Sequence, residues 1–85
     1  MRRAQIEEEV LEALGEVVPG VRADALDAAA LLRDQFDIDS MDFLNFVLAL
    51  QARFSVEVPP TSYPLFATVG CAVDCVAQRL AAKST

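Results

Sequence analysis

Apolar residues near the start of the chain recur every three or four positions, which is the spacing of an amphipathic helix. Glutamates between these apolar positions favour the early turns of such a helix through its dipole. Pro19–Gly20 then stops the pattern, so the sequence predicts a first long helix over residues 4–18. The apolar positions are Ile6, Val10, Leu11, Leu14, Val17 and Val18.

Residues 19–39 form a connection that is long for a small domain. Long connections are usually functional or contain short structure of their own. This one has enough apolar side chains to pack onto a core, so we expect a partly helical, docked loop. These side chains are Leu26, Leu31, Leu32, Phe36 and Ile38.

Residues 40–54 form the second predicted long helix, which either Asp39 or Ser40 can cap by accepting a hydrogen bond from a free backbone N–H group. Its core stripe consists of Phe43, Phe46, Val47, Leu50 and Phe54, with Leu44 at the edge. A second, largely uncharged side consists of Met41, Asn45, Leu48 and Ala52. Because a small domain rarely buries a helix on all sides, we expect the second side to face partner proteins.

The remaining residues predict one short and one long helix. Residues 55–67 are irregular, with a short helical turn over Tyr63–Phe66, and Thr68 can cap a last helix over residues 69–81. The fold class is therefore all-α: a small four-helix bundle with three long helices, one short helix and the long docked loop. We expect one domain over residues 1–85, with its core at about 4–81. The last apolar stripe is Val69, Ala72, Val73, Val76 and Leu80.

The composition indicates a folded protein that does not enter membranes. Apolar residues make up 54% of the 85 residues, and no apolar run approaches the roughly 20 residues that span a bilayer. Arg2–Arg3 is followed by Glu7–Glu9, where a secretion signal would need apolar residues. We therefore expect a cytoplasmic protein, and a monomer.

The net charge of −6 is concentrated in the first half of the chain. Residues 1–42 contain eleven acids and four bases, whereas residues 43–85 contain two acids and three bases. Such a field repels nucleic acid and anionic membranes and attracts proteins with basic patches. A solvated surface that keeps a small protein dispersed explains the same charges equally well.

The residue types exclude most catalysis and metal binding. A serine nucleophile needs a neighbouring base, and the chain has no histidine and only one lysine, Lys83. A calcium loop starting at Asp37 fails, because Asp42 stands where glycine is needed and Leu48 where glutamate is needed. Cys71 and Cys75 are too few for a zinc site, and we assign them no function. We therefore expect neither an enzyme nor a metal site.

Ser40 nevertheless stands out, because it begins a helix and is ringed by Asp37, Asp39 and Asp42. A plain helix cap explains the serine but not the acidic ring, the long loop or the second uncharged side. A helix N-terminus favours an attached anion through its free N–H groups and its dipole. The position thus suits a phosphate ester that another enzyme transfers to Ser40.

The stretch LLRDQFDIDSMDFLNFVLALQARFSVEVP resembles the acyl carrier proteins. That family has an Asp-Ser-Leu-like triplet, here Asp39-Ser40-Met41, before an apolar helix. A V-E-I-P-like exit follows, here Val56–Pro59, and ATVGCAV at 67–73 is similar to the opening of the family's last helix. The resemblance extends from about Ile6 to Leu80.

The resemblance implies a role for each matched residue. Ser40 would carry 4′-phosphopantetheine through a phosphodiester, and Asp39 would help the phosphopantetheinyl transferase and its magnesium engage. The thiol of the arm would hold acyl groups as thioesters. Acyl-loading enzymes would attach these groups to the arm, and acyl-accepting enzymes would take them from it. The helix after Ser40 would be the one that partner enzymes bind. The expected partner residues are Met41, Asp42, Asn45, Leu48 and Ala52.

Some positions depart from the family pattern. Asp37 stands where glycine is common, and Asn45, Gln51 and Ala52 stand where glutamates are common in carriers of fatty acid synthesis. Partner binding should therefore depend more on shape and apolar contact, which suggests a specialised carrier. Two alternatives remain at this point: an aminoacyl or peptidyl carrier of the same fold, and an unmodified helical adaptor.

Overall fold

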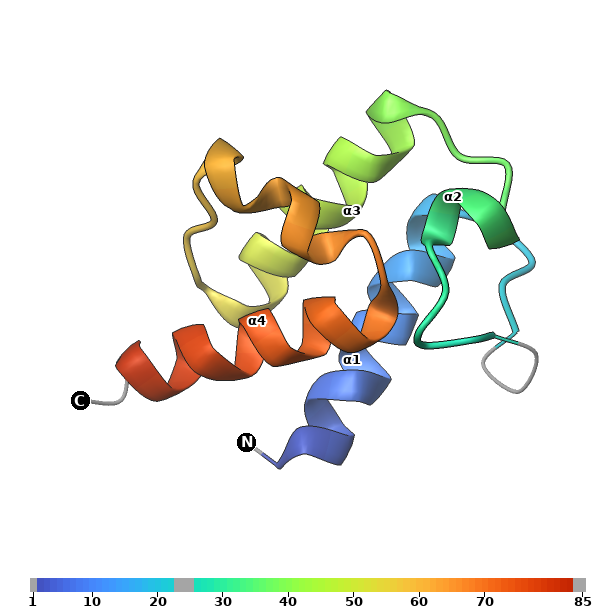
Figure 1. Cartoon of the computed structure of the whole chain (residues 1–85). Helices are drawn as coiled ribbons and strands as arrows, with labels where there is room; N and C mark the ends of the chain where they lie inside the picture. The colour runs from blue at the N-terminus through green and yellow to red at the C-terminus, as the bar shows by residue number, and fades with distance from the viewer. Residues whose placement is uncertain (1, 23–25, 84–85) are drawn as a thin grey trace.

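Three helices of 15 residues each make up most of the structure, a computed structural model that describes residues 2–22 and 26–83 (Figure 1). The long helices are α1 (Arg3–Val17), α3 (Ser40–Phe54) and α4 (Val69–Lys83). Two short helices are α2 (Leu32–Gln35) and the 3₁₀ helix η2 (Pro60–Phe66). No strand occurs within the two described ranges. The predicted all-α bundle is confirmed, although the short helix covers seven residues and not only Tyr63–Phe66.

The helix ends follow local signals in the sequence. Helix α1 ends just before Pro19–Gly20. Gly20 has a φ of 88°, a backbone angle that residues with a Cβ rarely adopt. The Thr68 hydroxyl accepts a hydrogen bond of 3.0 Å from the Cys71 N–H, so the predicted cap of α4 is confirmed. The glutamates expected to favour the early turns of this helix do not lie in its first turn. Helix α1 begins at Arg3, and its first turn contains no acid.

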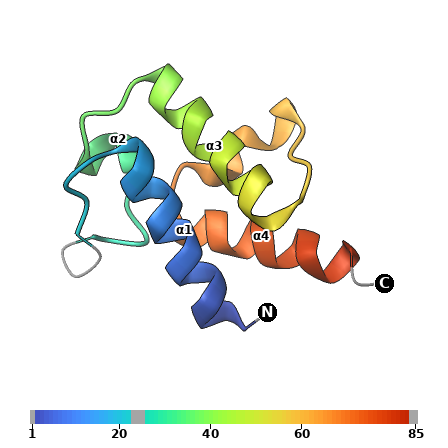
Figure 2. The same ribbon diagram turned by 180° about the vertical axis from the view of Figure 1, so that it is seen from behind.

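The apolar faces of the long helices meet in one core. Helix α1 packs against both α3 and α4, crossing α4 in the two opposite views of Figures 1 and 2, and η2 packs against α4. The predicted stripe of α3 is buried except for Phe43, which is half-buried, and Cys75 of α4 is fully in the core. The core side chains of α1, α3 and α4 are Ile6, Val10, Ala13, Leu14, Phe46, Val47, Leu50, Phe54, Val69, Ala72, Val73, Cys75 and Val76.

The described part of the long connection is docked, as predicted. The Leu32 N–H donates to the Ala67 carbonyl at 2.8 Å, and the Gly70 N–H donates to the Ala28 carbonyl at 2.9 Å. A Cβ on residue 70 would lie 3.1 Å from that carbonyl oxygen, so glycine allows the close approach. The Leu32 side chain is buried in the core. Residues 23–25 of the predicted loop lie outside the described residues.

The side chain of Gln35 organises the loop that precedes it. Its Oε1 accepts from the Asp27 N–H at 2.8 Å, and its Nε2 donates to the carbonyls of Asp27 and Ala30 at 2.7 and 3.1 Å. The amide thereby satisfies backbone groups that have no partner in a regular element. The loop is held by specific bonds as well as by apolar packing.

Part of the acidic surface is neutralised within the molecule. The Arg53 guanidinium on α3 lies 2.6 Å from Glu16, 3.1 Å from Glu12 and 3.9 Å from Glu9, all on α1. The hydrogen bond to Glu16 is the main reason that the pKa of Arg53 is raised. Three acids of the first half of the chain therefore join α1 to α3 through Arg53. Fewer acidic side chains are left to attract the basic patches of partner proteins.

We expect Phe54→Ala to lower the free energy of unfolding by about 3–5 kcal/mol, because it leaves a cavity in the core. Phe54 is only 5% exposed, whereas Leu48 on the same helix is 46% exposed. Leu48→Ala is the matched control and should change stability by less than about 0.5 kcal/mol. Urea unfolding measures the stability of both variants. Equal midpoints would contradict the assignment of Phe54 to the buried face of α3 and of Leu48 to its exposed face.

We expect Gln35→Ala to loosen the loop without unfolding the bundle. The Asp27 N–H and the Ala30 carbonyl lose their partner, so the Asp27 amide should exchange with solvent faster, while core amides of α3 keep their rates. Gln78→Ala on exposed α4 surface provides the control. Hydrogen exchange by NMR reads each amide, and unchanged exchange at Asp27 would show that the bonds to Gln35 do not hold the loop.

Candidate functional site

The N-terminus of α3 is fixed by two carboxylates that bond each other's backbone. Asp39 has extended backbone angles (φ −101°, ψ −176°), and its Oδ1 accepts from the Asp42 N–H at 2.8 Å. In return, Oδ2 of Asp42 accepts from the Asp39 N–H at 3.3 Å. This reciprocal capping box settles which of the two predicted candidates caps the helix: it is Asp39.

Ser40 is the first residue of α3 and its side chain is exposed. Because Asp39 provides the cap, the Ser40 hydroxyl makes no hydrogen bond within the described part of the chain. The first N–H groups of the helix lack intrahelical partners, and the dipole adds positive character there. An ester-linked phosphate on this hydroxyl would thus find a favourable electrostatic position, despite the neighbouring acids.

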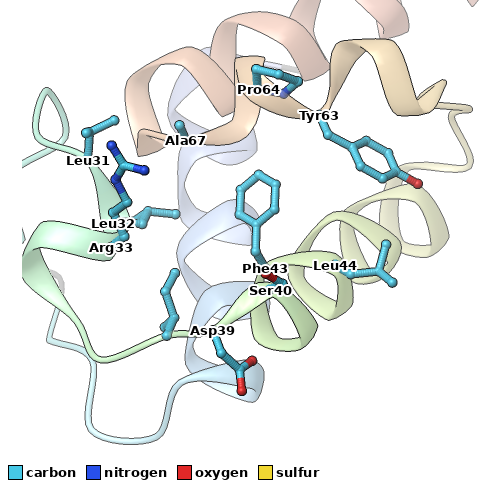
Figure 3. A pocket seen from close by; sticks show the side chains of 11 residues that line it. Leu31, Leu32, Arg33, Asp39, Ser40, Phe43, Leu44, Tyr63, Pro64 and Ala67 are labelled. Carbon is cyan, nitrogen blue, oxygen red and sulfur yellow. The ribbon is translucent and has the colours of Figure 1, made fainter.

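A pocket of about 690 Å³ opens beside Ser40 (Figure 3). Its walls come from α2 and the flanking loop, from the first turns of α3, and from η2 with the residue after it. Phe43 points its ring into this space, which explains why Phe43 is only half-buried. The lining residues are Leu31, Leu32, Arg33, Ile38, Asp39, Ser40, Phe43, Leu44, Tyr63, Pro64 and Ala67.

The pocket was not predicted, although several of its residues were noted for other reasons. A pocket wall shared by three separate segments leaves no periodic pattern within any one of them. The sequence therefore did not indicate a pocket at Arg33, Tyr63, Pro64 and Ala67. The sequence clue was indirect: a long loop with more apolar residues than a linker needs.

The expected partner residues of α3 mostly face solvent. Met41 is 64% and Leu48 46% exposed, and Asn45 and Ala52 are exposed as well. Asp42 differs, because it is half-buried and its carboxylate belongs to the capping box. The structure therefore brings four of the five residues onto an open, uncharged surface, and whether partners bind there stays a prediction.

The two cysteines have different surroundings. Cys71 is exposed and Cys75 is buried, and neither forms a disulfide. The Cys75 sulfur accepts a hydrogen bond of 3.4 Å from Arg79 Nε, and the Glu57 carbonyl accepts one of 2.9 Å from Nη1 of the same guanidinium. Among the described residues no group of three or more potential ligands could hold a metal ion.

Comparison with known proteins identifies the family to which this chain belongs. Residues 5–71 match the sequence model of the family described as "phosphopantetheine attachment site". Acyl carrier proteins of Kineococcus radiotolerans and Beutenbergia cavernae are 33% and 32% identical to this chain, over 75 and 77 residues. The alignments cover 85% and 87% of this chain and 93% and 94% of those proteins. This chain belongs to the acyl carrier protein family.

The fold agrees with this assignment. The structure is similar to that of an acyl carrier protein from Enterococcus faecalis, with a TM-score of 0.77 and 25% sequence identity. The superposition covers 93% of this chain and 99% of that one. The similarity therefore extends over nearly the whole fold of this carrier.

Membership confirms the predicted function and cofactor: this carrier holds acyl groups on covalently bound 4′-phosphopantetheine. Members of the family carry acyl groups and are not catalysts, so the carrier is not an enzyme. It interacts with a phosphopantetheinyl transferase and with acyl-handling enzymes. The exposed, unbonded Ser40 hydroxyl at a helix N-terminus fits such an arm. No described helix has the length and apolar character needed to cross a membrane.

We expect Asp39→Ala to destabilise the carrier by about 1 kcal/mol, because the Asp42 N–H loses its cap. Asp39→Asn keeps an oxygen acceptor at the same place and should retain most of the stability. Asp37→Ala removes an exposed acid that lies outside the capping box and is the control. Urea midpoints compare the three, and equal stability of the alanine and wild-type proteins would show that the capping box contributes nothing.

Proposed function

We propose that Ser40 is the residue that carries the arm and that Asp39 supports the transfer reaction. The observation that supports this most is the exposed, unbonded hydroxyl at the start of α3, beside a large pocket. Two of the other hydroxyls within residues 5–71 are already engaged in hydrogen bonds. Ser62 accepts from Arg79 at 3.2 Å and Thr68 caps α4, so both hydroxyls are engaged.

In the transfer, the Ser40 oxygen forms a bond to the β-phosphorus of coenzyme A. The pyrophosphate bond of coenzyme A breaks, adenosine 3′,5′-bisphosphate leaves, and the hydroxyl proton passes to a base of the transferase. The carrier itself supplies an exposed oxygen whose position is set by the capping box. The Asp39 carboxylate retains lone pairs beyond the one that binds Asp42, and these suit a magnesium ion brought by the transferase.

The arm ends in a thiol, which holds the acyl group as a thioester. We propose that the pocket beside Ser40 shelters that group between encounters with enzymes. Seven of its lining side chains are aliphatic or aromatic hydrocarbons: Leu31, Leu32, Ile38, Phe43, Leu44, Pro64 and Ala67. Burying the alkyl part of a cargo there is favourable by about 25 cal/mol per Å² of apolar surface removed from water.

Partner enzymes are proposed to bind the open surface formed by Met41, Asn45, Leu48 and Ala52, with Asp42 at its border. This surface has no charged side chain of its own, so its contacts depend on shape and apolar burial more than on charge. Leu65 of η2 is another exposed apolar side chain, at 52%. We also propose that the carrier works as a cytoplasmic monomer, where an exposed free thiol such as Cys71 stays reduced.

The test is the intact mass after incubation with coenzyme A, magnesium and a phosphopantetheinyl transferase of broad specificity. Wild type should gain one phosphopantetheine, Ser40→Ala should gain none, and Ser55→Ala, a control at the end of α3, should react like wild type. Asp39→Asn keeps the cap acceptor and should react more slowly, if its charge supports the transfer.

A gain on Ser40→Ala would place the arm on another residue. No gain on the folded wild-type protein would instead favour an unmodified adaptor that binds partners through α3. An unchanged rate for Asp39→Asn would confine Asp39 to its capping role.

A further inference from the structure

Arg33 is a cation without a partner among the described residues, in a chain where acids outnumber bases by 13 to 7. Most other cations of the described chain are engaged with protein groups. Arg33 makes no hydrogen bond or ion pair within the described residues, although Asp34 is its neighbour in sequence. The engaged cations include Arg3 with Asp74 at 2.6 Å, Arg53 with Glu16, Arg79 with the Glu57 carbonyl and Lys83 with the Ser55 carbonyl at 2.7 Å.

This free cation lies on the wall of the pocket beside Ser40. Arg33 extends from α2 on one side of the pocket, whereas Ser40 belongs to α3 (Figure 3). Among the described residues that line the pocket, the other charged side chain is Asp39, whose carboxylate accepts from the Asp42 backbone N–H. The pocket thus combines hydrocarbon walls with one guanidinium that forms no ion pair with any acid of the described residues.

A purely hydrocarbon cargo would not use this guanidinium, which would stay in water above its apolar stem. A carboxylate could form two parallel hydrogen bonds with its planar fork. The attraction between the two charges is stronger beside apolar walls than in bulk water. The phosphate of the arm is bonded to Ser40 on the α3 side, whereas Arg33 lies on the α2 side, which leaves Arg33 available to a group of the cargo.

We propose that Arg33 is a specificity-determining residue that favours acyl groups with a carboxylate at the end away from the thioester. The carrier would then shelter the monothioester of a dicarboxylic acid better than a simple fatty acyl group of equal length. This inference rests on the proposed attachment of the arm at Ser40 and names the cargo class of that same site.

The experiment compares two cargoes of equal length, an eight-carbon fatty acyl group and the eight-carbon dicarboxylic monoacyl group. A phosphopantetheinyl transferase loads each from its coenzyme A thioester onto wild type, Arg33→Gln, Arg33→Lys and Arg3→Gln. Arg3→Gln has the same change in charge, but at an exposed ion pair on α1 that does not line the pocket. Intact mass first confirms loading, and this step alone tests the attachment at Ser40.

The rate of thioester cleavage by hydroxylamine then measures shelter, with each cargo normalised to its coenzyme A thioester. Arg33→Gln should lose the dicarboxylic cargo about fivefold faster than wild type, and added salt should reduce this difference. A fivefold change corresponds to about 1 kcal/mol. Arg33→Lys should retain part of the effect, because it keeps the charge but not the fork. The fatty acyl cargo should be cleaved at the same rate on every protein, and Arg3→Gln should match wild type.

Equal cleavage of the dicarboxylic cargo on wild type and Arg33→Gln would overturn the proposal while leaving attachment at Ser40 intact. A similar acceleration of both cargoes would also overturn it, since Arg33 would then act on the arm or the pocket wall. Failure to load any folded protein would remove the proposed attachment, and the inference with it.

Discussion

The capping box between Asp39 and Asp42 determines where α3 begins, and the site depends on that starting point. A helix that starts at Ser40 places this hydroxyl outside the bundle, Phe43 at the pocket, and Phe46, Val47 and Leu50 in the core. These positions follow from 3.6 residues per turn, so a start shifted by one residue would rotate the whole set by about 100°. The same two carboxylates also leave the serine free for modification, because the helix needs no cap from its hydroxyl.

The pocket depends on a second constraint, the docking of the long loop onto the start of α4. Backbone bonds from Leu32 to Ala67 and from Gly70 to Ala28 join segments that are far apart in the sequence. Side-chain periodicity cannot indicate such bonds, because they involve only backbone atoms. This explains why the sequence predicted the three long helices, their buried faces and the Thr68 cap, but not the pocket or the position of Arg33. Apolar residues in the loop indicated docking without indicating where it occurs.

The distribution of charge on the surface differs most from what the sequence suggested. The acidic first half of the sequence suggested an acidic surface for partners, yet Glu9, Glu12 and Glu16 surround Arg53, and the carboxylates of Asp39 and Asp42 hold the start of α3. The outward side of α3 is left with Met41, Asn45, Leu48 and Ala52, none of them charged. Counting charges along a sequence cannot separate acids that bind within the molecule from acids available to a partner.

A carrier has to hold its cargo firmly enough to protect it and loosely enough to release it. Apolar walls alone provide a non-directional attraction that grows with the length of any alkyl chain, so they distinguish poorly between cargoes of equal length. One exposed guanidinium adds a directional preference of modest size, because solvent and salt still reach it. Selectivity of this kind discriminates by charge without raising the barrier to release very far. Arg33 has no ion-pair partner among the described residues and lies beside hydrocarbon walls, so its charge is better suited to selecting a cargo than to stabilising the fold.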